Sequence, residues 1–253
     1  MANGFSVIKL GGAMTTDRGV LDAIASACDA GMVIVHGGGG LISQRLAERG
    51  LDIPKIDGIR PTHAEQLPVV VGVLAGEVNT QLVADLVSRG VNAVGLTLAD
   101  GPLVTIEPSD PALGFVGTVS GGDAKAVRAL VDAGFLPVVG SIGVDAQGQL
   151  RNVNADDAAA GLAAALNAES LTFVSDTAGV LDADRNTIAS IAVDEVERLI
   201  TDGIATDGMA AKLRAAATAA SNHGIPVTIG GINADPAQTT TIHARALAKD
   251  ATT

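Results

Sequence analysis

The sequence predicts an α/β protein in which helices cover both faces of a mainly parallel, open sheet, as in a three-layer αβα sandwich. One observation is that short apolar runs alternate with helical patterns, which is typical of βαβ units. The other is composition. The 253 residues are 47% hydrophobic but only 2% aromatic. We therefore expect a core of Val, Ile, Leu and Ala, as in parallel strands buried on both faces.

Six apolar runs are the expected strands. Gly or Asp lies just past the carboxyl end of five of them. Ligands of open α/β sheets bind at the carboxyl ends of the strands, so the sequence predicts a site at that edge. The expected strands are Phe5–Leu10, Met32–Val35, Ala93–Leu98, Leu136–Ser141, Leu171–Ser175 and Val227–Ile229.

Helix boundaries are also readable. A glycine that can adopt the left-handed conformation ends each of three expected helices. Asn154, with two acidic residues after it, is typical of a helix start. Another helix begins at Thr206 and Asp207. Two segments break this rhythm and are expected to be hairpins. The expected helices are Leu41–Arg49, Leu82–Arg89, Lys125–Ala133, Ala158–Leu166 and the one from Thr206 to His223; the hairpins are Leu103–Val119 and Asp145–Val153.

Charge and cysteine content restrict the function. The net charge of −12 argues against nucleic acid or an anionic membrane as partner. A single cysteine, Cys28, excludes a disulfide within the chain and fits a reducing cytoplasm. We see no signal peptide and no stretch long enough to span a bilayer. The chain is divided most naturally near residue 168, into segments 1–167 and 168–253, which together could count as one domain.

Lys9 lies near the end of the expected first strand and is followed by Gly11 and Gly12. Lysine is rarely buried without a partner, and adjacent glycines let a phosphate approach the backbone. An edge-strand lysine pointing to solvent is the alternative. The strand-end position favours a site.

The run from His36 to Gly40 follows a strand and opens a helix, where backbone N–H groups are available for an anion. It is not a Walker A loop, because no Gly-Lys-Ser/Thr follows. It also lacks the acidic partner of a dinucleotide fingerprint. A generic glycine turn is an equally good interpretation. His36 itself is expected to be a hydrogen-bonded structural residue.

Three further features of the sequence are each weak evidence for a binding site when taken alone. Arg60 lies in a loop, where it could clamp a carboxylate or simply be solvated. Asn152 and Asp156 flank the helix start at Asn154, where capping explains at least one of the three. Lys212 lies in the first turns of a helix, where it opposes the helix dipole unless a phosphate is near. Their joint occurrence at strand ends and helix starts is a stronger indication of a phosphate site.

The chain resembles the amino acid kinase family over nearly its whole length. The order and spacing of the matching segments are specific for that family. The carboxyl-terminal tail departs from it, because Thr239-Thr240-Thr241 stands where a Gly-Thr pair is usual. The matching segments are IKLGGAM, VIVHGGGG, DGIRPT, VLAGEVNTQL, AVGLTLADG, GFLPVVGSIGV, GQLRNVNADDAA, FVSDTAGVL and GIATDGMAAKLRAA.

The resemblance implies a role for each matching residue. Lys9 and Lys212 would stabilise the transferring phosphoryl group, and Asp156 would orient both lysines. The segment 1–167 would hold the acceptor, through Gly38, Gly39, Arg60 and Asn152. The segment 168–253 would hold ATP. The implied nucleotide-binding residues are Gly11, Gly12, Asp176, Thr177, Ala178, Gly179, Val180, Leu181, Ile204, Ala205 and Thr206.

The activity implied by the resemblance is ATP-dependent phosphorylation of the side-chain carboxylate of N-acetyl-L-glutamate, a step of arginine biosynthesis. Such a carboxylate is already ionised, so no general base is required. Mg²⁺ would be held mainly by the ATP phosphates, with no assigned protein ligand. Because the first strand begins near Phe5, no room is left for the extra helix of arginine-inhibited hexamers. A cytoplasmic homodimer without arginine inhibition is therefore expected.

Rival functions remain at this point. The nearest is a kinase for aminoadipate linked to a carrier protein, in lysine biosynthesis, although the loop at residues 55–60 has few basic residues. A carbamate kinase would not need the Arg60 clamp. A non-catalytic nucleotide sensor would not need Lys9, Asp156 and Lys212 together.

Overall fold

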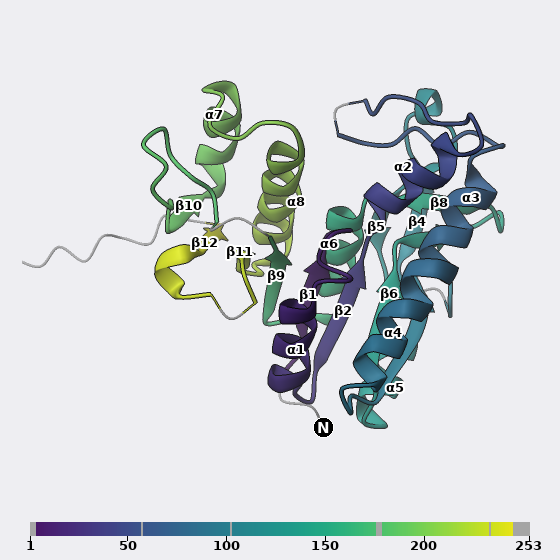
Figure 1. Ribbon diagram of the computed structural model, residues 1–253. Helices are drawn as coiled ribbons and strands as arrows, with labels where there is room; N and C mark the ends of the chain where they lie inside the picture. Colours follow the sequence, from purple (N-terminus) through teal and green to yellow (C-terminus); the bar gives the residue numbers. More distant parts are fainter. Residues whose placement is uncertain (1–3, 57, 102, 176–178, 233, 245–253) are drawn as a thin grey trace, which may run out of the picture.

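In a computed structural model, helices cover both faces of one eight-stranded sheet, which confirms the predicted αβα sandwich (Figure 1). The structure describes residues 4–56, 58–101, 103–175, 179–232 and 234–244. The strand order is β10-β12-β11-β9-β1-β2-β6-β3, and every pair is parallel except β11 with β12. The bounds are β1 Ser6–Leu10, β2 Met32–His36, β3 Ala93–Thr97, β6 Leu136–Gly140, β9 Ser170–Val174, β10 Ser190–Ala192, β11 Val227–Gly230 and β12 Thr240–His243.

All six expected strands are present in this sheet, each within one residue of the expected ends. The sequence did not indicate β10 and β12. Both are short strands at one side of the sheet, and β10 forms its edge. The parallel strands place their carboxyl ends along one edge, where the glycine and polar residues follow.

A second, four-stranded sheet has the order β4-β5-β8-β7. Both expected hairpins are confirmed, because β4 pairs antiparallel with β5 and β7 pairs antiparallel with β8. Gly148, with φ +80°, closes the turn of the second hairpin. A parallel pair, β5 with β8, joins the two hairpins. The bounds are β4 Thr105–Pro108, β5 Val116–Gly121, β7 Ile142–Val144 and β8 Leu150–Val153.

The expected helices are found with similar bounds, and others are added. Asn154 caps α6 as predicted, because its side chain accepts hydrogen bonds from the N–H groups of Asp156 and Asp157. The α-helices are α1 Arg18–Ala27, α2 Gly39–Ala47, α3 Leu67–Val71, α4 Asn79–Val87, α5 Lys125–Asp132, α6 Ala155–Leu166, α7 Val196–Thr201 and α8 Asp207–His223. The shorter elements are a π-helical segment, η1 Gly72–Val78, and the 3₁₀ turns η2 Pro111–Leu113, η3 Val193–Glu195 and η4 Pro236–Gln238.

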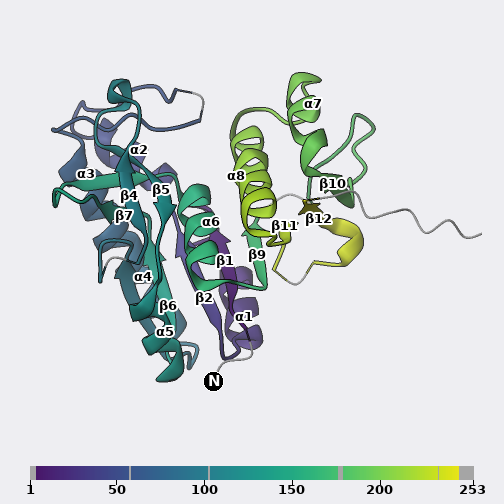
Figure 2. The same ribbon diagram turned by 180° about the vertical axis from the view of Figure 1, so that it is seen from behind.

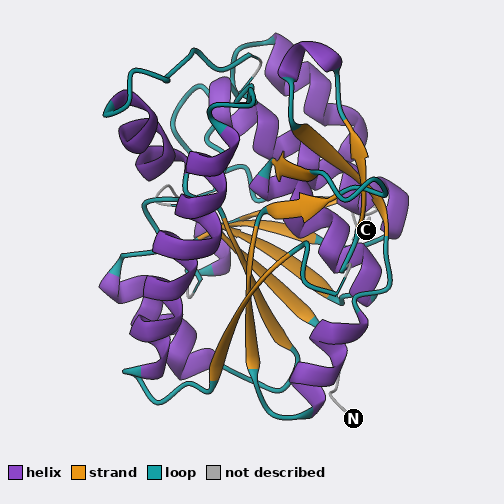
Figure 3. Cartoon of the chain, turned by 90° about the vertical axis from the view of Figure 1, so that its right-hand side faces the viewer, coloured by secondary structure: helices purple, strands orange, loops and turns teal. Residues whose placement is uncertain are grey.

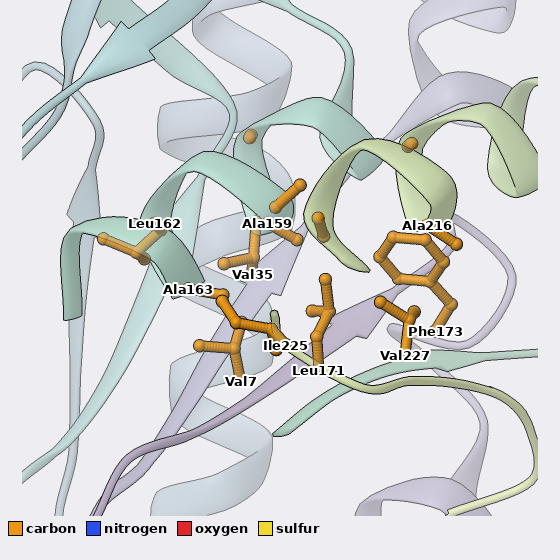
Figure 4. Close-up of a cluster of buried hydrophobic side chains, with 14 of the residues drawn as sticks. Val7, Val35, Ala159, Leu162, Ala163, Leu171, Phe173, Ala216, Ile225 and Val227 are labelled. Atoms are coloured by element: carbon orange, nitrogen blue, oxygen red, sulfur yellow. The ribbon is translucent and has the colours of Figure 1, made fainter. Parts of the chain in front are cut away.

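The core lies on both faces of the main sheet. Helices α5, α6 and α8 cover one face, where α6 and α8 lie side by side (Figures 1 and 2). Helices α1 and α4 cover the other face, and Figure 3 shows the strands between the two helical layers. Figure 4 shows the first face, where Val7, Leu171 and Phe173 of the sheet meet Ala159 and Ala216. The many alanines on α6 and α8 let both helices approach the sheet closely.

The expectation that no stretch is long enough to span a bilayer was wrong. Residues 67–87 form one helical stretch through α3, η1 and α4, long and apolar enough by length and composition to do so. In this structure α4 packs on β3 and β6, and Leu82 and Leu86 belong to the core. The sequence indicated only its last part, because Pro68, Gly72 and Gly76 disfavour a continuous helix.

Candidate active site

A cavity of about 230 Å³ opens at the carboxyl ends of the central strands. It brings together eight of the residues singled out in the sequence. They come from strand ends, loops and the starts of helices, at the edge of the sheet where the parallel strands end. The eight are Lys9, Gly11, Gly12, Gly38, Gly39, Arg60, Asn152 and Asp156.

Lys9 and Asp156 form a nearly buried ion pair at one wall of this cavity. The Lys9 Nζ and Asp156 Oδ1 atoms are 2.8 Å apart, and the two side chains are 9% and 12% exposed. Oδ1 is nevertheless buried without an aligned hydrogen-bond donor, so the contact is electrostatic rather than a directed hydrogen bond. In the described part of the chain, no aligned acceptor is found for the ammonium either. A buried cation with unused donors is a favourable place for an anionic ligand.

Two glycine loops, one at Gly11-Gly12 and the other from Gly37 to Gly40, lie against each other beside Lys9. A Cβ on Gly12 would be 3.4 Å from the amide nitrogen of Gly39, so glycine permits this approach. A Cβ on Gly39 would meet no described atom within 4 Å. In the part of the chain that the structure describes, no side chain caps α2, which leaves its first N–H groups for a ligand. The N-cap residue of α8, Thr206, makes no side-chain cap hydrogen bond either, and the first turns of α8 reach the cavity through Gly208 and Ala211.

Arg60 is held firmly rather than solvated. It is 7% exposed, and its guanidinium donates to the carbonyl oxygen of Gly39 at 3.0 Å and to the hydroxyl of Ser43 at 2.5 Å. A third donation, at 3.3 Å, goes to the carboxylate of Asp52. Of the five N–H groups of an arginine, two remain for a ligand. Arg60 therefore ties its loop to the start of α2 while it lines the cavity.

Asn152 belongs to β8 and is 9% exposed. Its amide donates a hydrogen bond to the hydroxyl of Thr62 at 3.0 Å. Gly58, which lines the cavity near Arg60, lies close to α8: a Cβ on Gly58 would be 3.5 Å from the Cβ of Ala211. The cavity thus has walls from both segments of the chain.

His36 is structural, as predicted. It is fully buried; its Nε2 accepts from the amide of Asn79 at 2.9 Å, and its Nδ1 donates to the carbonyl oxygen of Gly37 at 3.1 Å. Burial lowers the pKa of His36 from 6.5 to about 4, so the ring is neutral at pH 7. The same amide nitrogen is 3.2 Å from the carbonyl oxygen of Leu96 and 2.9 Å from that of Val138, so its two N–H groups are shared among three acceptors and tie α4 to the sheet.

Comparison with known proteins gives the family. The sequence profile of the amino acid kinase family matches residues 4–231. The chain belongs to this family. An acetylglutamate kinase from Serratia proteamaculans (strain 568) is 44% identical over 230 residues, which are 88% of this chain and 89% of that protein. An acetylglutamate kinase from Yersinia pestis (strain Pestoides F) is 42% identical over the same shares of the two chains.

Solved structures agree with the fold of this amino acid kinase. The crystal structure of smu.665 from Streptococcus mutans UA159 superposes with a TM-score of 0.84 at 27% identity, covering 95% of this chain and 99% of that one. A carbamate kinase from Giardia gives a TM-score of 0.68 at 18% identity, covering 96% and 99%. The second likeness concerns the fold alone.

Among the residues expected to bind the nucleotide of this amino acid kinase, Gly11 and Gly12 line the cavity, and the others lie in residues 176–181 and 204–206. Asp176, Thr177 and Ala178 lie outside the described residues. Val180 and Ala205 are buried in one hydrophobic cluster, whereas Thr206 is exposed and Ile204 half-buried. Leu181 pairs with Thr187 in a short bridge. None of the described residues in these two ranges lines the cavity.

One of the unusual carboxyl-terminal threonines, Thr240, contacts the loop that carries Gly179 and Val180. The hydroxyl of Thr240, which is fully buried, accepts a hydrogen bond from the N–H group of Val180 at 2.7 Å. Gly179 has φ +56°, and a Cβ there would lie 2.5 Å from the same hydroxyl. Glycine is therefore required for the loop to lie against β12.

Lys212 lies on α8 and is half-buried, but it does not line the cavity, although its neighbour Ala211 does. The structure thus brings Lys9 and Asp156 together and leaves Lys212 outside the cavity wall.

Sequence reasoning missed several residues around the cavity. Lys55 and Ser141 line it as polar groups, and Ile42, Ile59 and Leu74 line it as apolar ones. Ser141 could have been found, because it lies at the end of an expected strand. Thr62 carried no signal of its own, since its bond to Asn152 joins segments that are distant in the sequence.

Proposed function

We propose that this protein transfers the γ-phosphoryl group of ATP to the side-chain carboxylate of N-acetyl-L-glutamate, as a step of arginine biosynthesis. The carboxylate oxygen bonds to the γ-phosphorus while the bond from that phosphorus to the bridging oxygen breaks. The products are an acyl phosphate and ADP. The names of the relatives and the share of the chain that they match support this choice.

The observation that carries the proposal is the Lys9 ammonium beside two uncapped helix starts. Phosphoryl transfer requires positioning and neutralisation of charge on the equatorial oxygens. Lys9 is buried, is held by Asp156, and has N–H groups without an aligned acceptor among the described residues. The amides of Gly11, Gly12 and Gly39 flank it at the same cavity. These groups suit a phosphoryl group in transfer and need no general base.

The acceptor is proposed to lie between Arg60, Asn152 and the glycine loop. Arg60 would hold the α-carboxylate with the donors that its protein contacts leave over. The N–H groups at Gly38 and Gly39 would hold the carboxylate that is phosphorylated.

ATP is proposed to bind in the segment from residue 168 onward, which leaves 1–167 as the acceptor segment. The loop that includes Gly179, Val180 and Leu181, together with Ile204 to Thr206, would line it, and Lys212 would reach the phosphates from the start of α8. Mg²⁺ would arrive with the phosphates and neutralise part of their charge. Among the described residues, no three His, Cys, Asp or Glu side chains gather to hold a metal.

We also propose a cytoplasmic homodimer. β3 forms one edge of the main sheet, with most of its residues half-buried, and Val87 on the neighbouring α4 is 53% exposed. A second copy would cover both. Sedimentation velocity tests the dimer: a monomer at micromolar concentration contradicts it.

The test of the activity is hydroxylamine trapping. When hydroxylamine is added to purified protein with ATP, Mg²⁺ and N-acetyl-L-glutamate, the amount of hydroxamate formed should equal the amount of ADP formed. Omission of the acceptor should abolish the signal. Binding of ATP without any hydroxamate would instead favour the nucleotide sensor.

A further inference from the structure

Thr62 links two residues assigned to the acceptor. Its hydroxyl donates to the carbonyl oxygen of Arg60 at 3.2 Å, and it accepts from the Asn152 amide at 3.0 Å. Because the one hydroxyl hydrogen is used on Arg60, the oxygen can only accept from Asn152. The Asn152 nitrogen must therefore face Thr62. Turning the amide over would place two acceptors against each other.

The backbone holds this pair in place. Phe115 donates its N–H to the carbonyl oxygen of Thr62 at 2.7 Å and accepts from the N–H of Asn152 at 2.9 Å. Thr62 in turn donates its N–H to the carbonyl oxygen of Leu113 at 2.9 Å. Between them Gly114 has φ +69°, and a Cβ there would be 2.5 Å from the Thr62 carbonyl oxygen. The side chains of Thr62 and Asn152 are thus fixed next to each other.

This orientation determines what Asn152 offers to the cavity. One of its two N–H groups is used by Thr62, which leaves the second N–H and the carbonyl oxygen Oδ1. Among the described residues, Oδ1 has no hydrogen-bond donor. A ligand that satisfies the amide needs an N–H group for Oδ1 and an acceptor oxygen beside it. The nitrogen and carboxylate on the α-carbon of an N-acyl amino acid supply this pair.

We propose that Thr62 is a positioning residue that fixes the Asn152 amide and so makes the site select acceptors with an N–H group next to a carboxylate. This rests on the proposed function and deepens it. Thr62 is fully buried and does not line the cavity, so it acts through Asn152 rather than by contact with the acceptor. The selection is against acceptors that have both carboxylates but no nitrogen, such as glutarate.

The test compares Thr62→Val, Thr62→Ser and wild type. Valine keeps the shape but leaves the buried Asn152 N–H without its acceptor, and serine restores the hydroxyl. In Thr62→Val the KM for N-acetyl-L-glutamate should rise about tenfold with the KM for ATP unchanged, whereas Thr62→Ser should stay near wild type. The Ki of glutarate, measured as an inhibitor against N-acetyl-L-glutamate, should change much less. The ratio of the glutarate Ki to the N-acetyl-L-glutamate KM should therefore fall in Thr62→Val.

Thr118→Val is the matched control, because Thr118 is exposed on β5 of the same small sheet. It should leave both KM values unchanged. An unchanged acceptor KM in Thr62→Val overturns the proposal. So do equal rises in the acceptor KM and the glutarate Ki, or a parallel loss of ATP affinity, because either would reflect general loosening. If the wild type itself makes no acyl phosphate, the proposed function fails and takes this inference with it.

Discussion

The Lys9 ammonium lies 2.8 Å from the Asp156 carboxylate, and so joins the end of the first strand to the first turn of α6. Both side chains are nearly buried, which would be costly for either alone. Asp156 is also near the positive end of its helix, which stabilises its charge. The pair therefore keeps a cation in place at the cavity wall while leaving its N–H groups available.

Lys9→Ala should lower kcat far more than it weakens ATP binding. The loss of an interaction made mainly in the transition state lowers kcat. For one charged donor, we expect kcat to fall about 10²–10³-fold. Lys125→Ala is the control, because that side chain is 85% exposed and lies outside the site. Turnover of the Lys9 variant near the wild-type rate would refute the assignment.

Lys212→Ala should have a similar effect on kcat, of about 10²–10³-fold, if Lys212 reaches the transferring group when ATP binds. Its position on α8 beside Ala211 motivates this. The measurement is steady-state turnover together with ATP binding by calorimetry. Arg214→Ala, at a position further along the same helix whose side chain is 51% exposed, should retain turnover. A kcat above a tenth of wild type in Lys212→Ala would remove Lys212 from the mechanism.

Thr240→Val should raise the KM for ATP several-fold and leave the acceptor KM unchanged. The variant leaves the buried Val180 N–H without its acceptor, a loss of about 1–3 kcal/mol, so the proposed nucleotide loop is held less well. Thr240→Ser should behave as wild type, and Thr241→Val, at the half-buried neighbour, serves as control. Equal changes in both KM values would speak against a local effect on the loop.

Stability should fall in acid because of His36. Its pKa is about 4 in the folded protein, against the ordinary value of 6.5 that we take for the unfolded chain, so the unfolded chain binds more protons between these values. The neutral ring thus contributes stability that is complete above pH 6.5 and is lost as pH falls toward 4. We expect the contribution of His36 to the free energy of unfolding to be about 2 kcal/mol lower at pH 5 than at pH 7.5.

Urea titrations of the wild type and of His36→Gln at both pH values isolate this contribution. His36→Gln keeps a hydrogen-bonding side chain but cannot titrate, so its own difference between the two pH values should be smaller by about the same amount. An equal pH dependence in the two proteins would mean that His36 is not the group responsible.

The main sheet was predictable because its strands are continuous apolar runs with glycine or polar residues at their ends. Strands β10 and β12 were not, since each is only three or four residues long and without a distinct pattern. The helix through residues 67–87 was missed in part for a different reason. Its glycines and Pro68 are unfavourable in isolation, but packing on the sheet and on α2 outweighs that preference.

The candidate site was predictable where chemistry lies at strand ends and helix starts, as for Lys9, the glycine loops and Asp156. It was not predictable where contacts join residues that are distant in the sequence. The bonds from Arg60 to Ser43, from Thr62 to Asn152 and from Val180 to Thr240 depend on how loops meet in space. No periodicity in the sequence encodes such pairs.

The acceptor identity tests the account most directly. We would measure kcat/KM for N-acetyl-L-glutamate, L-glutamate and N-acetyl-L-aminoadipate on one preparation. The free ammonium of glutamate would be buried where a neutral N–H is expected, and a site built from polar groups discriminates strongly. We predict that N-acetyl-L-glutamate is used best and glutamate poorly. Preference for the aminoadipate compound, or turnover of none of the three, would contradict the account.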